Sequence, residues 1–125
     1  MSSQRWDINH RRTGRTTRML AAAFRAAYNG ETVTILAPGT GPTAFMAYCV
    51  PILMDMGACK VNKQTHRVDV GYGPKAGRIF FRTRNDELFD SETMTFRGTP
   101  GVFMFDHEAI RQMFNRALEM YHGWD

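Results

Sequence analysis

Two segments of this 125-residue chain combine residue types that could do chemistry together. Residues 13–17 read Thr-Gly-Arg-Thr-Thr and open an expected helix, and Asp106 ends a strongly apolar run. A helix that begins in a basic, glycine-containing loop offers free backbone N–H groups, the positive end of its dipole and cationic side chains, which together form a phosphate cradle. A carboxylate beside that cradle could hold a hydrated Mg²⁺ that bridges to the phosphate.

Apolar patterning predicts the elements that position these two segments. A helix is expected from Thr16 or Thr17 to Asn29, with Gly30 as its stop, and a strand over 32–37 suited to burial on both faces. In an open parallel sheet, ligands bind where strands present their carboxyl ends and helices their amino ends. Both segments should therefore meet at one edge of a sheet. The apolar stripe of the helix is Met19, Leu20, Ala23, Phe24 and Ala27.

The remaining elements are shorter or interrupted. A second helix is expected over 43–56, with a kink or break near Val50 because Pro51 lies inside it. A polar stretch over 83–95 is expected to be a surface loop. Before it, three short strands are expected over 60–62, 67–70 and 78–82, the last two forming a hairpin around 66–83. After it, a strand is expected over 101–105 and a final helix over 108–121.

The order of the motifs gives a resemblance. Residues 9–17 are similar to the P-loop pattern G-x-x-x-x-G-K-[ST] at Gly14 and the hydroxyl residue, with Asn9 for the first glycine and Arg15 for the lysine. Then follow a strand ending in Pro-Gly-Thr, the 78–82 strand, an Arg-Gly pair and the apolar strand before Asp106. In this order, over about residues 9–110, the chain resembles the first half of the ATPase core of superfamily 1 and 2 helicases and of phage large terminases.

The resemblance implies a fold and a ligand. The fold would be a three-layer, RecA-like α/β domain of the P-loop NTPase type over residues 1–125, with a mainly parallel sheet, helices on both faces and an added β-hairpin. ATP would be the bound nucleotide, with Arg15 at the position of the P-loop lysine. Thr16 and Asp106 would hold Mg²⁺. The nucleotide-binding residues would be Arg12, Thr13, Gly14, Arg15, Thr16 and Thr17.

Two departures from the family pattern concern catalysis. The catalytic Glu of these families directly follows the Asp, whereas here His107 does so and Glu108 comes one residue later. A shift of one position along a helix rotates the direction of the side chain by about 100°. His107 and Glu108 are therefore the two candidates for orienting the attacking water. The planar guanidinium of Arg15 also differs from a compact lysine, so hydrolysis is expected to be weak or absent.

Simpler interpretations stay open for the same residues. Thr13 or Thr16 could be an ordinary helix N-cap, and Asp106 could be the N-cap of the final helix. Trp6, Tyr72 and Phe80 could stack on bases, although aromatic residues in strands usually pack in the core.

The net charge of +4 is concentrated in one part of the chain. Residues 1–30 hold six arginines and one aspartate, whereas the remaining residues hold ten basic and eleven acidic side chains. Such a block suits a phosphate site, a nucleic-acid arm or a solvated helix face. No apolar run approaches the ~20 residues that span a bilayer, and no secretory signal pattern is present. A cytoplasmic protein without a membrane partner is expected, with Cys49 and Cys59 as reduced thiols.

Together these observations favour a small phage-type, P-loop-like protein that binds ATP with Mg²⁺ and acts in nucleic-acid metabolism. The alternative is a non-enzymatic module that binds nucleic acid or a protein partner on a degenerate ATPase scaffold. A homo-oligomer is a third possibility, in which a neighbouring copy supplies an arginine finger. The candidates for that finger are Arg82, Arg84 and Arg97.

Overall fold

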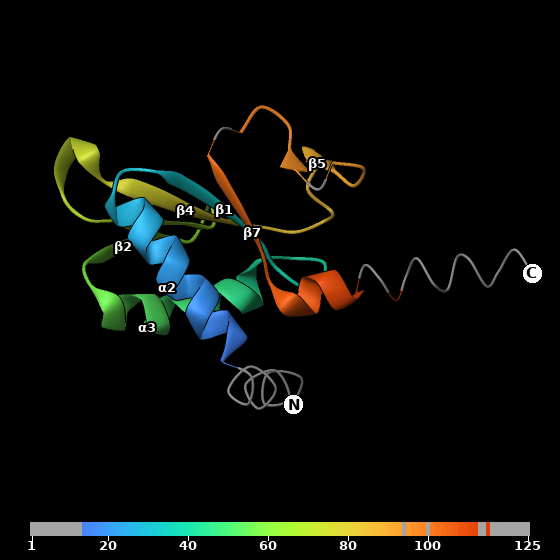
Figure 1. Ribbon diagram of the computed structural model, residues 1–125, viewed down its shortest axis with the longest axis horizontal. Coiled ribbons are helices and arrows are strands. Elements are labelled where there is room, and N and C mark those ends of the chain that lie inside the picture. Colours follow the sequence, from blue (N-terminus) through green and yellow to red (C-terminus); the bar gives the residue numbers. More distant parts are fainter. Residues whose placement is uncertain (1–13, 94, 100, 113–114, 116–125) are drawn as a thin grey trace, which may run out of the picture.

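The computed structural model describes residues 14–93, 95–99, 101–112 and 115. Two helices, α2 (Arg15–Tyr28) and α3 (Thr43–Met56), pack side by side against a five-stranded sheet (Figure 1). The strands of this sheet are β1 (Thr32–Leu36), β2 (Cys59–Asn62), β3 (Arg67–Val70), β4 (Gly77–Arg82) and β7 (Val102–Phe105). A short 3₁₀ helix, η1 (Gly73–Lys75), precedes β4.

The sheet is mixed, with strand order β2-β3-β4-β1-β7. Strand β1 lies between β4 and β7 and runs parallel to both. Strands β2, β3 and β4 pair antiparallel in succession. The hairpin predicted around 66–83 is confirmed as β3–β4, and the α/β class is confirmed with it.

The main core lies between the sheet and the two helices. Val33 and Ile35 of β1 are fully buried on this face, against Leu20 of α2 and Leu53 of α3. On the other face, Thr34 is 1% exposed because its register partners on both sides are phenylalanines. The prediction that β1 is buried on both faces is therefore confirmed.

Helix α3 continues through Pro51 to Met56, so of the kink or break predicted near Val50, the break does not occur. Proline cannot donate to the carbonyl four residues earlier, which is that of Ala47. Both Pro51 and Ala47 are exposed, so this carbonyl lies on the solvent side of the helix. Burial of Cys49 before the proline and Leu53 after it holds both halves against the same core.

The polar stretch over 83–95 is not only a loop. It contains β5 (Phe89–Asp90), which pairs antiparallel with β6 (Thr95–Phe96). The rings of Phe89 and Phe96 lie 5.2 Å apart, and Phe96 is buried together with Leu36 and Ala109 in a second apolar cluster. This small sheet therefore rests on the carboxyl end of the larger one.

The final helix is described over 107–112 and at residue 115; the rest of its predicted range lies outside the described residues. Within the described part of the chain, no helix is long and apolar enough to cross a membrane.

Candidate functional site

The amino end of α2 begins at a glycine in a left-handed conformation. Gly14 is the N-cap residue, with φ 63° and ψ 6°. Among the described residues, no side chain caps this end of the helix with a hydrogen bond. Glycine adopts this conformation at no steric cost. The prediction of Thr16 as N-cap is wrong, because the helix already begins at Arg15; Thr13 and Arg12 lie outside the described residues.

Thr16 faces inward, toward the strand end predicted to carry the metal ligand. Its Oγ1 hydroxyl donates to Oδ1 of Asp106 at 3.0 Å, and both residues are 1% exposed. The two predicted metal ligands, ninety positions apart in the sequence, are thus brought together. Their neighbour Thr17 is exposed.

Asp106 is fixed from three sides. Its backbone N–H donates to the carbonyl of Leu36 at 3.1 Å, which extends the β1–β7 pairing by one residue. Its second carboxylate oxygen, Oδ2, accepts the backbone N–H of Glu108 at 2.9 Å. Asp106 therefore also caps the final helix, and the simpler interpretation of this residue is confirmed alongside its contact with Thr16.

The Thr16–Asp106 pair suits a hard cation that arrives with its own ligands. In the described part of the chain, no three His, Cys, Asp or Glu side chains gather as metal ligands. Mg²⁺ is usually bound through one or two carboxylates plus substrate phosphates, and it keeps several waters. A hydroxyl that donates its proton to a carboxylate keeps its lone pairs for a cation. The donor set thus fits Mg²⁺ bound together with a phosphate.

The two candidates for water activation are both engaged elsewhere. Nη1 of Arg15 lies 2.9 Å from Nδ1 of His107, across the mouth of the site. The same Nη1 also lies 3.2 Å from Nε2 of His107, so the guanidinium of Arg15 is held against the imidazole ring. Oε1 of Glu108 accepts from Arg111 at 2.8 Å, one turn further along its own helix. The carboxylate of Glu108 therefore faces Arg111 in this structure.

Loops from neighbouring strand ends close the same edge of the sheet. The backbone N–H of Gly39, in the loop after β1, donates to Oε1 of Gln112 at 2.8 Å. Thr83, directly after β4, donates its hydroxyl to the carbonyl of Thr40 at 3.4 Å. The carboxyl ends of β4, β1 and β7 are thereby tied to one another.

The three candidate finger arginines differ in their surroundings. Arg82 pairs with Asp86 at 3.1 Å and lies over the ring of Phe80. Arg97 donates to the carbonyl of Glu87 at 3.1 Å. Nε and Nη1 of Arg84 are buried and have no hydrogen-bond partner among the atoms that the structure describes.

A buried thiol lies close enough to the site to sense its charge. Cys49 is fully buried and free, and its pKa is raised far above the usual range, first by burial and then by the negative charge of Asp106. Cys59 is half-buried, and burial raises its pKa as well. The expectation of two unpaired thiols is confirmed.

The aromatic residues fall into different environments. Tyr72 is 86% exposed, so the core interpretation does not apply to it. Phe80 is half-buried under Arg82, and Trp6 lies outside the described residues. Sequence reasoning missed Tyr28, which is 66% exposed and lines a pocket together with Tyr72. Tyr28 lies one turn after Phe24 and stacks on its ring, at the carboxyl end of the apolar stripe of α2, so its spacing alone would have assigned it to the core.

Comparison of this chain with protein families, with curated proteins and with solved structures finds no match.

Proposed function

We propose that this protein binds a nucleoside triphosphate, ATP, together with Mg²⁺ at the amino end of α2, and that it acts in nucleic-acid metabolism. The observation that carries the proposal is the buried hydrogen bond between Thr16 and Asp106. It joins the helix that would hold the phosphates to the strand that would hold the metal. The fold we propose with it is the three-layer, RecA-like P-loop type.

The proposed roles follow from the chemistry of each group. Backbone N–H groups of the first turn, beginning after Gly14, would meet the phosphate oxygens, aided by the helix dipole. Arg15 would supply a positive charge to the same phosphates. The Thr16 hydroxyl and the Asp106 carboxylate would hold Mg²⁺, directly or through its waters. A bound Mg²⁺ would neutralise the charge on the phosphates.

Weak or absent hydrolysis is part of the proposal. The Arg15 guanidinium contacts the His107 ring, and the Glu108 carboxylate forms an ion pair with Arg111. Activation of water requires a base within hydrogen-bond reach of it. Either His107 or Glu108 would first have to leave its present partner.

The test is isothermal titration of the folded protein with ATP and Mg²⁺, repeated with EDTA in place of Mg²⁺. Binding is expected with Mg²⁺ and should be at least tenfold weaker without it. Thr16→Val should weaken Mg²⁺-ATP binding at least tenfold, because it removes the hydroxyl and keeps the shape. Thr65→Val, at an exposed threonine in the turn between β2 and β3, is the matched control and should change affinity less. Absence of heat at millimolar nucleotide, with folding verified by circular dichroism, contradicts the proposal.

One observation favours the alternative, a non-enzymatic module that binds nucleic acid or protein. The Arg15 guanidinium contacts the His107 side chain, whereas the nucleotide proposal requires this guanidinium to contact a phosphate. A thermal-shift measurement separates the two functions, because a ligand that binds only the folded state must raise the melting temperature. A rise with Mg²⁺-ATP supports the nucleotide site. A rise with DNA alone supports the module.

A further inference from the structure

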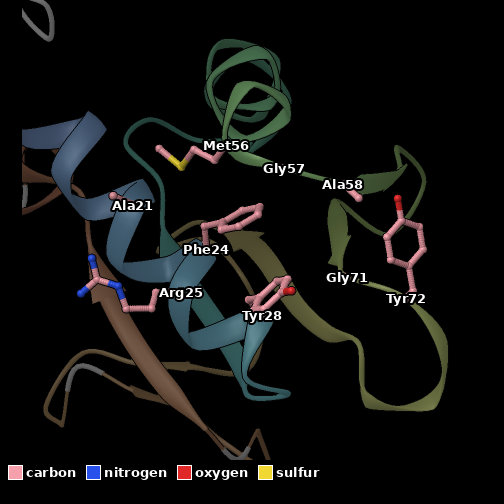
Figure 2. A pocket seen from close by; sticks show the side chains of 9 residues that line it. All are labelled: Ala21, Phe24, Arg25, Tyr28, Met56, Gly57, Ala58, Gly71 and Tyr72. Atoms are coloured by element: carbon pink, nitrogen blue, oxygen red, sulfur yellow. The ribbon is translucent and has the colours of Figure 1, made fainter.

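A second concave surface lies toward the other end of α2, away from Gly14 and Asp106. It is a pocket of about 690 Å³ between the carboxyl-terminal half of α2, the end of α3 and the turn after β3 (Figure 2). We call it the aromatic groove. Its volume is within the range of small-ligand pockets. Its lining residues are Ala21, Phe24, Arg25, Tyr28, Met56, Gly57, Ala58, Gly71 and Tyr72.

Aromatic rings stand on two sides of the aromatic groove. Phe24 and Tyr28 are one helical turn apart, with ring centroids separated by 6.2 Å and planes inclined by 18°, so they form an offset stack. Tyr72 rises from the opposite side, in the turn after β3 (Figure 2). Tyr28 is 66% and Tyr72 86% exposed. Two ring faces are thus open to an incoming planar group.

Glycines determine the shape of the aromatic groove. Gly71 and Gly73 have φ of 92° and 74°, a region that favours glycine. Tyr72 lies between these two glycines and is therefore flanked by residues without side chains. A Cβ at Gly57 would lie 2.7 Å from Cζ of Phe24. Glycine at position 57 therefore lets the Phe24 ring lie against the end of α3.

One charged side chain lines the aromatic groove, and it is a cation. Arg25 is the one charged residue among the nine that line it, and it is exposed. Lys75, exposed in η1, follows Tyr72 by three residues in the same turn. An occupant with flat faces and negative charge complements this surface.

We propose that the aromatic groove binds single-stranded nucleic acid, with a base stacked on Tyr28 or Tyr72 and backbone phosphates near Arg25 and Lys75. Aromatic side chains in a basic groove bind single strands without sequence preference, because every base has a π-face. A proline-rich peptide also packs on aromatic rings, but it brings no negative charge to the two cations. The proposal uses none of the residues of the nucleotide site and does not depend on it.

The test is fluorescence anisotropy with 5′-fluorescein-labelled oligothymidylate and oligouridylate of twelve nucleotides at 50 mM salt. The wild-type protein is expected to bind both and to lose affinity as salt rises. Tyr72→Ala and Tyr28→Ala should each weaken binding about 5- to 100-fold, whereas Tyr72→Phe keeps the ring and stays near wild type. All of these positions are exposed, so melting temperatures should not change by more than a few degrees.

A matched pair of charge variants locates the binding surface. Arg25→Ala removes a cation from the aromatic groove, and Arg78→Ala removes one from an exposed position on β4 that alternates with buried Ile79. Arg25→Ala should weaken binding several-fold more than Arg78→Ala. A duplex of the same length should bind more weakly than a single strand, because its base faces are covered.

Several outcomes would overturn the proposal. These are no binding of either oligonucleotide, equal affinity of wild type and Tyr72→Ala, or equal effects of the two arginine variants. A proline-rich peptide that binds in a Tyr72-dependent way while the oligonucleotides do not would identify the occupant as protein. Thr16→Val should leave oligonucleotide affinity unchanged, so failure of the nucleotide site and failure of the aromatic groove are distinguishable.

Discussion

Asp106 meets two donors that belong to different elements. One oxygen accepts the Thr16 hydroxyl from α2, and the other accepts the backbone N–H of Glu108 in the final helix. A buried carboxylate is tolerated only when such donors compensate for its lost hydration. The same two bonds also point the carboxylate at the first turn of α2, so stability and a proposed metal role are combined in one side chain.

The two roles of Asp106 can be separated by substitution. Asp106→Asn keeps the size and a capping oxygen, since Asn caps helices about as well as Asp. We expect its free energy of unfolding to stay within about 1 kcal/mol of wild type, whereas Asp106→Ala loses about 2–4 kcal/mol with the cap and the buried acceptor. Urea unfolding measures both.

Nucleotide titration completes that comparison. Asp106→Asn should bind ATP equally with and without Mg²⁺, because the charge that attracts the cation is gone. If Asp106→Asn keeps the full Mg²⁺ effect of the wild type, the carboxylate is a structural cap and the metal role is wrong.

Among the elements, α2 and β4 approach so closely that only glycine fits between them. A Cβ at Gly77 would lie 2.0 Å from the carbonyl oxygen of Ala27, which is backbone and cannot turn aside. Gly77 begins β4, and Ala27 is fully buried in the main core. This contact sets the distance between the helix and the sheet.

Gly77→Ala therefore tests how α2 is positioned. We expect a loss of about 2 kcal/mol or more in the free energy of unfolding, because α2 must move away from the sheet. Gly41→Ala is the matched control: a Cβ there meets nothing within 4 Å, and Gly41 is not in the left-handed region. Thermal and urea unfolding of the two variants give the comparison. Equal stability of both would show that the contact is relaxed in solution.

The sequence predicted the elements whose signals are long or strongly patterned. The bounds 43–56 for α3 and the buried β1 followed from continuous apolar runs. The β5–β6 hairpin was missed because strands of two residues carry no periodicity. The break at Pro51 was wrong because packing on both sides of the proline outweighs one lost hydrogen bond.

The approach of Thr16 to Asp106 was predictable, and the other side-chain contacts at the candidate site were not. Thr16 and Asp106 could be paired from motif order, because strand ends and helix starts share an edge. The Arg15–His107 contact and the pairing of Glu108 with Arg111 depend on side-chain rotamers, which no spacing rule specifies. The aromatic groove is formed by three segments that are distant in sequence, so no single motif predicts it.

Across the whole molecule, one main core connects the two proposed sites through α2. The amino end of α2 holds Thr16, and the carboxyl-terminal half of α2 lines the aromatic groove. The buried side chains of α2 pack with Cys49 of α3 in the main core. A titration inside that core therefore affects the stability of the entire domain. The raised pKa of the Cys49 thiol provides such a titration.

We expect this thiol to make the protein less stable in alkali. The unfolded chain loses the Cys49 proton near the ordinary value of about 8.5, whereas the folded pKa is raised, so above pH 9 the folded state binds more protons. The free energy of unfolding should not depend on this group below pH 8. Above pH 9 it should fall by up to about 1.4 kcal/mol per pH unit from Cys49.

Cys49→Ala isolates this contribution from the tyrosines and lysines that titrate in the same range. The variant is less stable at pH 7, because it leaves a small cavity, but its stability should fall less steeply between pH 9 and pH 10.5. Urea unfolding at half-unit pH steps gives both curves. Burial is the larger cause of the raised pKa and the negative charge of Asp106 the smaller, so Asp106→Asn should leave this slope nearly unchanged. Parallel curves for wild type and Cys49→Ala would show that the thiol ionises as easily in the folded core as in the unfolded chain.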